Sequence, residues 1–179
     1  DIMERPCKRI PHEVIQTMDD ELQKRISGLR FAIAGSFRRK KPTSRDIDIV
    51  MSRGQHGNSR RAWTAFMKQM HSSRIVKFHK PYAGGDNKLT LLATIRIGPT
   101  VVTSIKNNHP NEPFNIGSTN IPNVWKVKVD IFVTPPDEYR FMLLYATGSG
   151  DFNIAMRAQA KRKGYMLNQK GLFRRSDNK

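Results

Sequence analysis

The stretch "IAGSFRRKKPTSRDIDIV", residues 33–50, joins a glycine turn and a basic cluster to two aspartates separated by one residue. Gly35 allows a tight turn and a close backbone approach, and the amides that follow, beginning with Ser36, can open a helix toward an anion. Strand side chains repeat every two residues, so Asp46 and Asp48 share one face. The stretch therefore predicts a phosphate-binding turn next to a pair of carboxylates.

Carboxylates repel phosphate, but they can bind Mg²⁺, which prefers carboxylate and phosphate oxygens. The alternating segment "WKVKVDIFVT", residues 125–134, offers a third carboxylate, Asp130, on the same strand side as Lys128. If this strand pairs beside that of Asp46 and Asp48, three carboxylates converge on a centre of two Mg²⁺ ions about 3.5–4 Å apart, with Mn²⁺ as a possible substitute. Such a centre catalyses phosphoryl or nucleotidyl transfer.

The charge of the chain predicts a polyanionic partner. Its 179 residues include 32 Lys and Arg against 15 Asp and Glu, which gives a formal net charge of +17. No apolar run approaches the ~20 residues of a membrane span, and the basic residues are dispersed, so we expect nucleic acid and no membrane. Cys7 is the only cysteine, which excludes an internal disulfide and fits a reducing intracellular compartment.

Apolar periodicity predicts an α+β fold. Helices are expected over residues 10–26, 59–70, 137–147 and 151–164. Strands are expected over residues 29–35, 45–52, 88–98 and 125–134. Residues 106–124 carry three prolines and no period, which predicts a long loop. We therefore expect a domain over 1–136 with a mixed sheet and flanking helices, then a small, mostly helical subdomain over 137–179.

Other site chemistries lack their residues. The segment "HEVIQ", residues 12–16, begins like a zinc-protease helix but has Gln16 where the second histidine belongs. The chain has neither a P-loop pattern nor a nucleophile elbow, which argues against P-loop NTPase and α/β-hydrolase chemistry.

Several segments, in the same order and over nearly the whole chain, resemble family X DNA polymerases of the beta type. They are "KRIPHEV", "GSFRR", "DID", "KVDIFVTPPDEY" and "LLYATGSGDFNIAMRAQAKRKGYMLNQKGLF". The resemblance implies a nucleotidyltransferase palm over 1–136 and a nucleotide-selecting thumb over 137–179. It also implies a template-directed, monomeric enzyme of the nucleus or mitochondrion that adds a dNMP to the primer 3′-OH of a DNA primer-template. The expected substrate is gapped DNA in base excision repair.

The resemblance also implies roles for individual residues. The catalytic metal ligands would be Asp46, Asp48 and Asp130. The residues at the incoming dNTP would be Gly35, Ser36, Arg39, Tyr145, Gly148, Ser149 and Asn153. The residues that contact DNA would be Lys88, Lys128 and Arg157.

Plainer interpretations stand beside these roles. Pairs of aspartates two residues apart are common on exposed strand faces, Tyr145 and Phe152 could be core aromatics of a helical hairpin, and Lys88 could be one surface charge among many. The whole chain could be a non-catalytic basic DNA-binding module with the same fold. A template-independent nucleotidyltransferase is a further alternative.

Two positions depart from the resembled family. Ala146 stands where an aromatic residue is usual after the tyrosine, and the backbone there helps to exclude a ribose 2′-OH. Gly150 stands where relatives carry a side chain near the incoming base. Few residues precede Gly35, so we also expect either a palm-plus-thumb fragment or a minimal polymerase.

Overall fold

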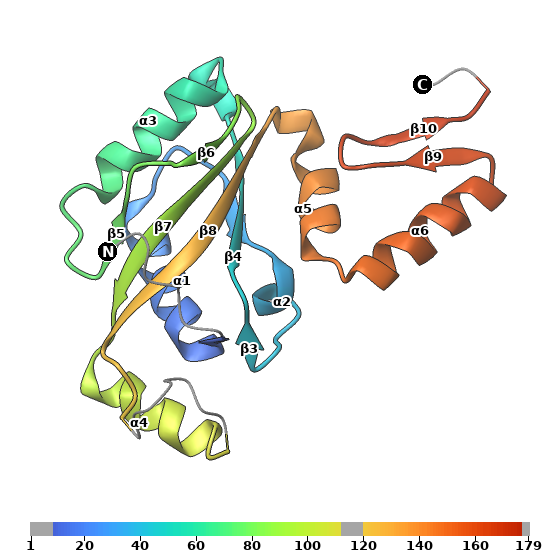
Figure 1. The fold of residues 1–179 in the computed structure, drawn as a ribbon. Helices are drawn as coiled ribbons and strands as arrows, with labels where there is room; N and C mark the ends of the chain where they lie inside the picture. The colour runs from blue at the N-terminus through green and yellow to red at the C-terminus, as the bar shows by residue number, and fades with distance from the viewer. Residues whose placement is uncertain (1–8, 112–119, 177–179) are drawn as a thin grey trace.

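The computed structural model describes residues 9–111 and 120–176 (Figure 1). Cys7 and residues 112–119 lie outside the described part, so the predictions for that cysteine and for the middle of the 106–124 loop are not tested. No helix within the described residues is long and apolar enough to cross a membrane.

A mixed, curved, six-stranded sheet forms the centre of the described chain, in the order β2-β4-β8-β7-β5 with β6 beside β7. Its strands are β2 (Phe31–Ile33), β4 (Ile47–Ser52), β5 (Val76–Phe78), β6 (Ala83–Gly84), β7 (Lys88–Arg96) and β8 (Val124–Thr134). Strands β4 and β8 run parallel, and the other pairs are antiparallel. Two short strands, β1 (Ile10–Pro11) and β3 (Thr43–Ser44), pair with each other beside it.

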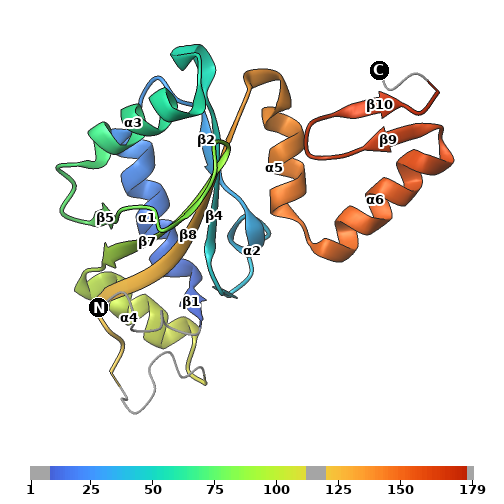
Figure 2. The same cartoon turned by 45° about the horizontal axis from the view of Figure 1, so that its top comes forward.

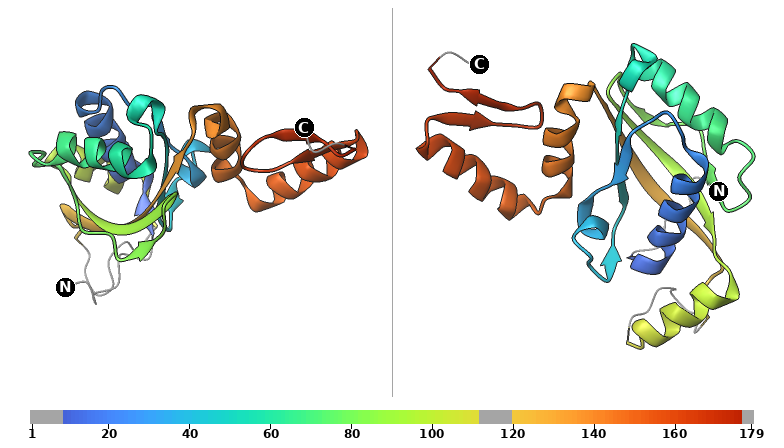
Figure 3. Two further views of the ribbon diagram at one scale, coloured as in Figure 1. Left: turned by 90° about the horizontal axis from the view of Figure 1, so that it is seen from above. Right: turned by 180° about the vertical axis from the view of Figure 1, so that it is seen from behind.

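Helices cover one face of this sheet, as Figures 2 and 3 show for α1 and α3. The helices of this part are α1 (His12–Arg25), the single turn α2 (Gly35–Arg38), the short 3-10 turn η1 (Gly54–His56), α3 (Ser59–Met70) and α4 (Pro99–Asn108). Apolar positions four residues apart on α1, from Val14 to Met18 and Leu22, are fully buried. They pack in one core with the alternating apolar side of β4 and β8.

The alternation predicted for the two site strands is observed. Ile47 and Ile49 of β4 and Val129 and Ile131 of β8 are buried beneath the helices. The intervening residues therefore face the other side of the sheet, which these helices leave open. This pleat sets the direction of the aspartates.

The C-terminal part extends from the open side of the sheet as an arm (Figure 1). It contains the 3-10 turn η2 (Pro136–Glu138), α5 (Tyr139–Thr147), α6 (Gly150–Arg162), β9 (Tyr165–Leu167) and β10 (Leu172–Arg174). Helix α5 joins it to the sheet, because Tyr139 is buried with Ala34 and Val50 in a second apolar cluster. The division of the chain at residue 136 stays a prediction.

Residues 106–124 are not loop throughout, which corrects the prediction. Helix α4 continues to Asn108 before the irregular residues begin. The sequence analysis missed this helix because it is rich in β-branched residues, which are weak helix formers. Pro99 at its start and the complete burial of Ile105 stabilise it.

Two further differences concern short strands. The hairpin of β9 and β10 was not predicted in the C-terminal subdomain, because its segments of three residues are too short for a clear alternation. The first predicted helix begins two residues late, at His12, because Ile10 and Pro11 pair with β3.

Candidate active site

Two of the three aspartates are paired on the open sheet face, and the third lies just before the strand. Asp48 and Asp130 are register partners in the parallel ladder of β4 and β8, and Asp46 lies two residues before Asp48. Thr90 of β7 is the register partner of Asp130 on the other side and donates a hydrogen bond of 2.7 Å from its hydroxyl to Asp130 Oδ1. This contact fixes one carboxylate oxygen and leaves the other for a ligand.

The charges of these carboxylates act on one another. Burial, and after it the negative charges of Asp46 and Asp130, raise the pKa of Asp48 from 3.8 to about 6. The ammonium groups of Lys88 and Lys128 act in the opposite direction. Because burial comes first among the causes and the neighbouring negative charges second, a bound cation would stabilise the ionised form of Asp48.

The donor set decides which cation fits. Within the described residues, no group of three His, Cys, Asp or Glu side chains is already gathered closely enough to hold a metal ion. The three carboxylates nevertheless occupy one face, and their oxygens suit a hard cation such as Mg²⁺ or Mn²⁺ rather than zinc. The residues present therefore fit a divalent metal held between β4 and β8.

Gly35 brings the phosphate-binding turn against this acidic face. Its backbone has φ +63°, a conformation that favours glycine, and a Cβ atom there would lie 3.1 Å from Asp48 Oδ2. Any side chain at this position would press on the carboxylate. The glycine is therefore needed both for the turn and for the close approach of α2 to β4.

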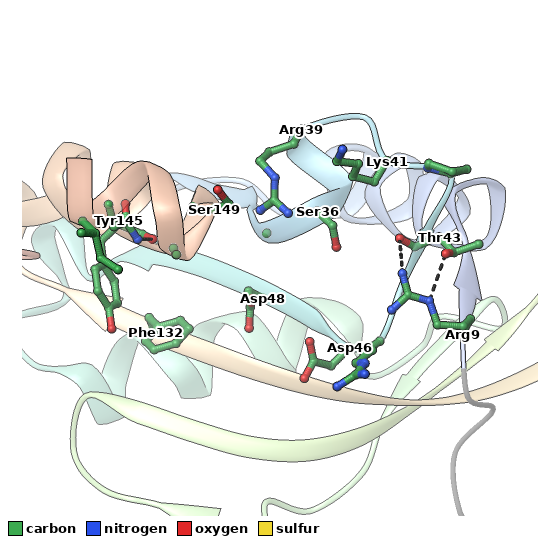
Figure 4. Close-up of a pocket in the computed structure, with 18 of the residues that line it drawn as sticks. Arg9, Ser36, Arg39, Lys41, Thr43, Asp46, Asp48, Phe132, Tyr145 and Ser149 are labelled. Carbon is green, nitrogen blue, oxygen red and sulfur yellow. Dashed lines mark hydrogen bonds between the residues drawn. The ribbon is translucent and has the colours of Figure 1, made fainter. Parts of the chain in front are cut away.

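Ser36 and Arg39 lie on the other side of a cavity from Asp46 and Asp48 (Figure 4). The cavity has a volume of about 860 Å³. The Ser36 hydroxyl is within 2.9 Å of the hydroxyl of Ser44, which is buried on β3. The basic side and the acidic side of the 33–50 stretch therefore face each other across one space.

The structure adds residues that the sequence analysis did not assign. Arg9 lines the cavity and donates from its guanidinium to the Thr43 hydroxyl at 3.0 Å and to the Thr43 carbonyl at 3.1 Å. Lys41 and Arg45 line it as well. Arg9 belongs to the quoted segment "KRIPHEV", but only the pairing of β1 with β3 brings that segment to the site.

The C-terminal arm supplies the far end of the cavity (Figure 4). Gly148, with φ +67°, and Ser149 connect α5 to α6, and the Ser149 hydroxyl accepts a hydrogen bond from the backbone of Phe152. Both residues line the cavity.

Tyr145, Asn153 and Arg157 also line the cavity and contact one another. Asn153 Nδ2 donates to the Tyr145 carbonyl at 2.9 Å, and the Arg157 guanidinium lies 5.5 Å from the centroid of the Tyr145 ring. Tyr145 and Phe152 are each 42% exposed, so they are not core aromatics. The structure thus brings these predicted nucleotide-binding and DNA-binding residues to one rim.

The two predicted DNA-binding lysines lie on the sheet near the carboxylates. Lys88 begins β7 and its ammonium lies 5.3 Å from the centroid of the Phe132 ring, which also lines the cavity. Lys128 shares the open face of β8 with Asp130. Lys88 is therefore a charge at the site rather than one on a remote surface.

Comparisons with known proteins agree with this arrangement. The model of the DNA polymerase beta palm matches residues 9–80, and that of the DNA polymerase beta thumb matches residues 142–179. DNA polymerase lambda of Rattus norvegicus is 28% identical over 96% of this chain, and that of Arabidopsis thaliana is 25% identical over 92%. DNA-directed DNA/RNA polymerase mu of Homo sapiens is 26% identical over 88%.

Fold and site thus define a palm and thumb of the nucleotidyltransferase class. The chain belongs to DNA polymerase family X. It spans between 26% and 33% of the length of these relatives.

Proposed function

We propose that this chain carries the catalytic centre of a template-directed DNA polymerase of the beta type that fills gaps in DNA during base excision repair. The observation that carries the proposal is the pairing of Asp48 with Asp130 in one parallel ladder, directly below the turn of Gly35. Asp46, Asp48 and the basic turn line one cavity, and Asp130 is the register partner of Asp48, which supports a divalent metal next to a triphosphate. The primer 3′ oxygen would attack the α-phosphorus of the dNTP, and pyrophosphate would leave.

Asp46 and Asp48 would hold both metal ions, and Asp130 would hold the one nearest the primer terminus. When bound, these Mg²⁺ ions would neutralise charge on the triphosphate and lower the pKa of the primer hydroxyl. Thr90 keeps Asp130 oriented through its hydrogen bond. Asp130 is 8% exposed, so little water reaches this carboxylate.

The other cavity residues would bind and orient the nucleotide. Ser36 and Arg39 would hold the β- and γ-phosphates, and Arg9, which lines the same cavity, would add a second guanidinium. Tyr145 would lie beside the sugar and Asn153 beside the base. Such positioning of an in-line arrangement supplies most of the rate acceleration in phosphoryl transfer.

DNA contacts would come from Lys88, which lies over the Phe132 ring, and from Arg157, which lines the cavity. Their charges add to a chain with a net charge of +17, which favours binding to phosphate backbones without sequence preference.

Primer extension on gapped and ungapped templates, with each dNTP and with Mg²⁺ or Mn²⁺, tests the proposal. We expect incorporation of the complementary dNMP only, with higher efficiency on gapped DNA, and no incorporation by an Asp46→Asn variant. Tight DNA binding without incorporation would instead identify a non-catalytic DNA-binding module. Incorporation that ignores the template would identify a template-independent transferase.

Ribonucleotide incorporation is a second candidate activity, and Ala146 favours it. This small residue lines the cavity next to Tyr145, where the resembled family carries an aromatic side chain. One relative is named a DNA/RNA polymerase. The same extension assay with rNTPs tests this activity.

A further inference from the structure

A groove follows α3 along the helix-covered side of the sheet. Near the start of the helix, a cavity of about 560 Å³ lies between Ser59 and the beginning of β7, at Leu89. Along the second half of the helix, a cavity of about 680 Å³ lies between Met67 and Phe78 of β5. Trp63 lines both cavities, so they adjoin at this side chain, along a helix about 18 Å long; the two together are hereafter the α3 groove.

Trp63 is held in place at the middle of the α3 groove. Its ring is stacked on Phe66, with centroids 5.7 Å apart and an angle of 17° between the planes. Phe66 is fully buried and packs edge-on against Phe78 at 5.2 Å. The indole is therefore a rigid, half-exposed aromatic surface, which would lose little conformational freedom on binding a flat ligand.

The rim of the α3 groove is positively charged. Arg53 and Arg60 line the cavity at the helix start, and Lys68 and Lys77 line the cavity at its end. Asp86 is the single acidic side chain among the lining residues of the two cavities. Four cations against one anion make the groove complementary to a chain of phosphates.

The α3 groove is separate from the nucleotide cavity. None of its lining residues lines that cavity. Ala62 and Phe66 of α3 pack in the same core as Ile49, whose side chain points to the opposite side of β4 from Asp48. A ligand in the groove would therefore leave the catalytic face free.

We propose that the α3 groove binds single-stranded DNA, with a base stacked on Trp63 and phosphates contacted by the four cationic side chains. A rigid aromatic surface in a basic groove is the arrangement that binds unpaired strands without sequence preference. Duplex DNA presents its phosphates outward and its bases inward, so it would leave Trp63 unused. The groove gives the chain a second nucleic-acid contact, in addition to the one proposed at the catalytic face.

Tryptophan fluorescence can test this directly, because the chain has two tryptophans and the other is inaccessible. Trp125 is 0% exposed, so a ligand that changes the emission by stacking acts on Trp63. We expect oligo(dT) to quench the emission of the wild-type chain and to leave that of a Trp63→Phe variant unchanged. An abasic oligonucleotide of the same length should bind more weakly and quench less.

Charge variants provide the second measurement. Arg60→Gln with Lys68→Gln removes two exposed cations from the rim. Log affinity for oligo(dT) falls with log salt, and the magnitude of this slope should decrease by about 1.4 in the variant, or about 0.7 for each phosphate contact on a single strand. Lys24→Gln with Lys106→Gln removes the same charge from exposed positions on α1 and α4 outside the groove. This control pair should retain the quenching and most of the slope.

Two outcomes would overturn the proposal. In the first, anisotropy shows that oligo(dT) binds, but Trp63 emission does not change and the affinity falls equally in the groove variant and in the control variant. The other is equal binding of poly-glutamate, which would identify an acidic-peptide surface. Neither readout depends on nucleotide incorporation. Oligo(dT) should therefore quench the emission of an Asp46→Asn variant as it does that of the wild type, whether or not the chain has the proposed polymerase activity.

Discussion

Arg39, the residue immediately after α2, donates a hydrogen bond of 2.6 Å to the carbonyl oxygen of Thr147, the last residue of α5. Its neighbour Arg38 donates to the Thr147 hydroxyl at 3.1 Å, and that hydroxyl donates to the Leu143 carbonyl at 2.6 Å. The guanidinium proposed to bind triphosphate thus also holds the end of α5, immediately before Gly148. If Arg39 binds phosphate as proposed, these two arginines would couple phosphate binding to the position of α5.

The Thr147 hydroxyl should help to position the thumb for nucleotide binding. Thr147→Val keeps the branched shape and the carbonyl that Arg39 contacts, but it removes the acceptor for Arg38. We expect the KM for dNTP to rise about 5-fold in this variant, because the loss of one exposed hydrogen bond costs about 1 kcal/mol.

Steady-state primer extension measures this KM, and filter binding measures the affinity for DNA, which should stay unchanged. Thr103→Val is the matched control, because the Thr103 hydroxyl donates to the Pro99 carbonyl within its own helix, α4. A KM in Thr147→Val equal to that of the control would contradict the coupling.

Asp130 should be essential for incorporation and dispensable for DNA binding. Asp130→Asn keeps the volume and an acceptor for the Thr90 hydroxyl but removes the charge that would hold the metal. We expect the incorporation rate to fall by at least about 10³-fold, which is the usual effect of removing one group that stabilises charge in the transition state. The affinity for DNA should stay nearly unchanged. Single-turnover extension and anisotropy are the two measurements.

Asp20→Asn on α1 is the control for this variant, because Asp20 also accepts one side-chain hydrogen bond, from Gln16. It should extend primers at the wild-type rate. Comparable extension by Asp130→Asn would show that the site is assigned wrongly.

The raised pKa of Asp48 predicts a pH-dependent cost of folding. The pKa rises from 3.8 to about 6, so the folded chain binds this proton more tightly than the unfolded chain does. The free energy of unfolding should therefore decrease as pH rises through that window, by an amount on the order of 2–3 kcal/mol. Below the window both states are protonated, and the cost disappears.

Urea unfolding at several pH values, in the absence of divalent ions, tests this for the wild type and for Asp48→Asn. The stability of the variant relative to the wild type should increase between pH 3.8 and about 6 and then stay constant. Addition of Mg²⁺ at neutral pH should stabilise the wild type more than the variant, because binding to the folded state shifts the equilibrium. A difference independent of pH would contradict the raised pKa of Asp48.

Ala146 should weaken discrimination between dNTP and rNTP. Its side chain packs beside the cluster of Ala34, Val50 and Tyr139 and also lines the cavity, so a small residue supports the backbone next to Tyr145 less firmly. In Ala146→Phe, the ratio of dNTP to rNTP efficiency should rise about tenfold, which corresponds to about 1.4 kcal/mol.

Ala155→Phe is the control, because Ala155 is exposed on α6 and does not line the cavity. The ratio should not change in this variant. An unchanged ratio in Ala146→Phe would mean that backbone position alone sets the sugar selectivity.

Local patterns in the sequence predicted the strands and the facing of their side chains. The alternation of residues 45–52 and 125–134 placed Asp46, Asp48 and Asp130 opposite the buried apolar residues, and the structure agrees. A period of two residues fixes which side chains share a face, whatever the strand pairs with. The roles of these aspartates stay predictions until the variants are measured.

Elements with weak or short patterns were not predictable in this way. Helix α4 has β-branched residues that disfavour a helix, and burial of Ile105 outweighs that preference. The hairpin of β9 and β10 is stabilised by its pairing rather than by its alternation.

The sequence by itself determined the chemistry of the site: which residues carry the carboxylates, the basic turn and the positive charge of the chain. Only the tertiary structure decided which residues lie next to them in space. Strand register set Asp48 beside Asp130 and Thr90 beside Asp130, and the pairing of β1 with β3 brought Arg9 to the cavity. These contacts join residues far apart along the chain, and their geometry depends on the packing of the whole sheet, which local periodicity does not encode.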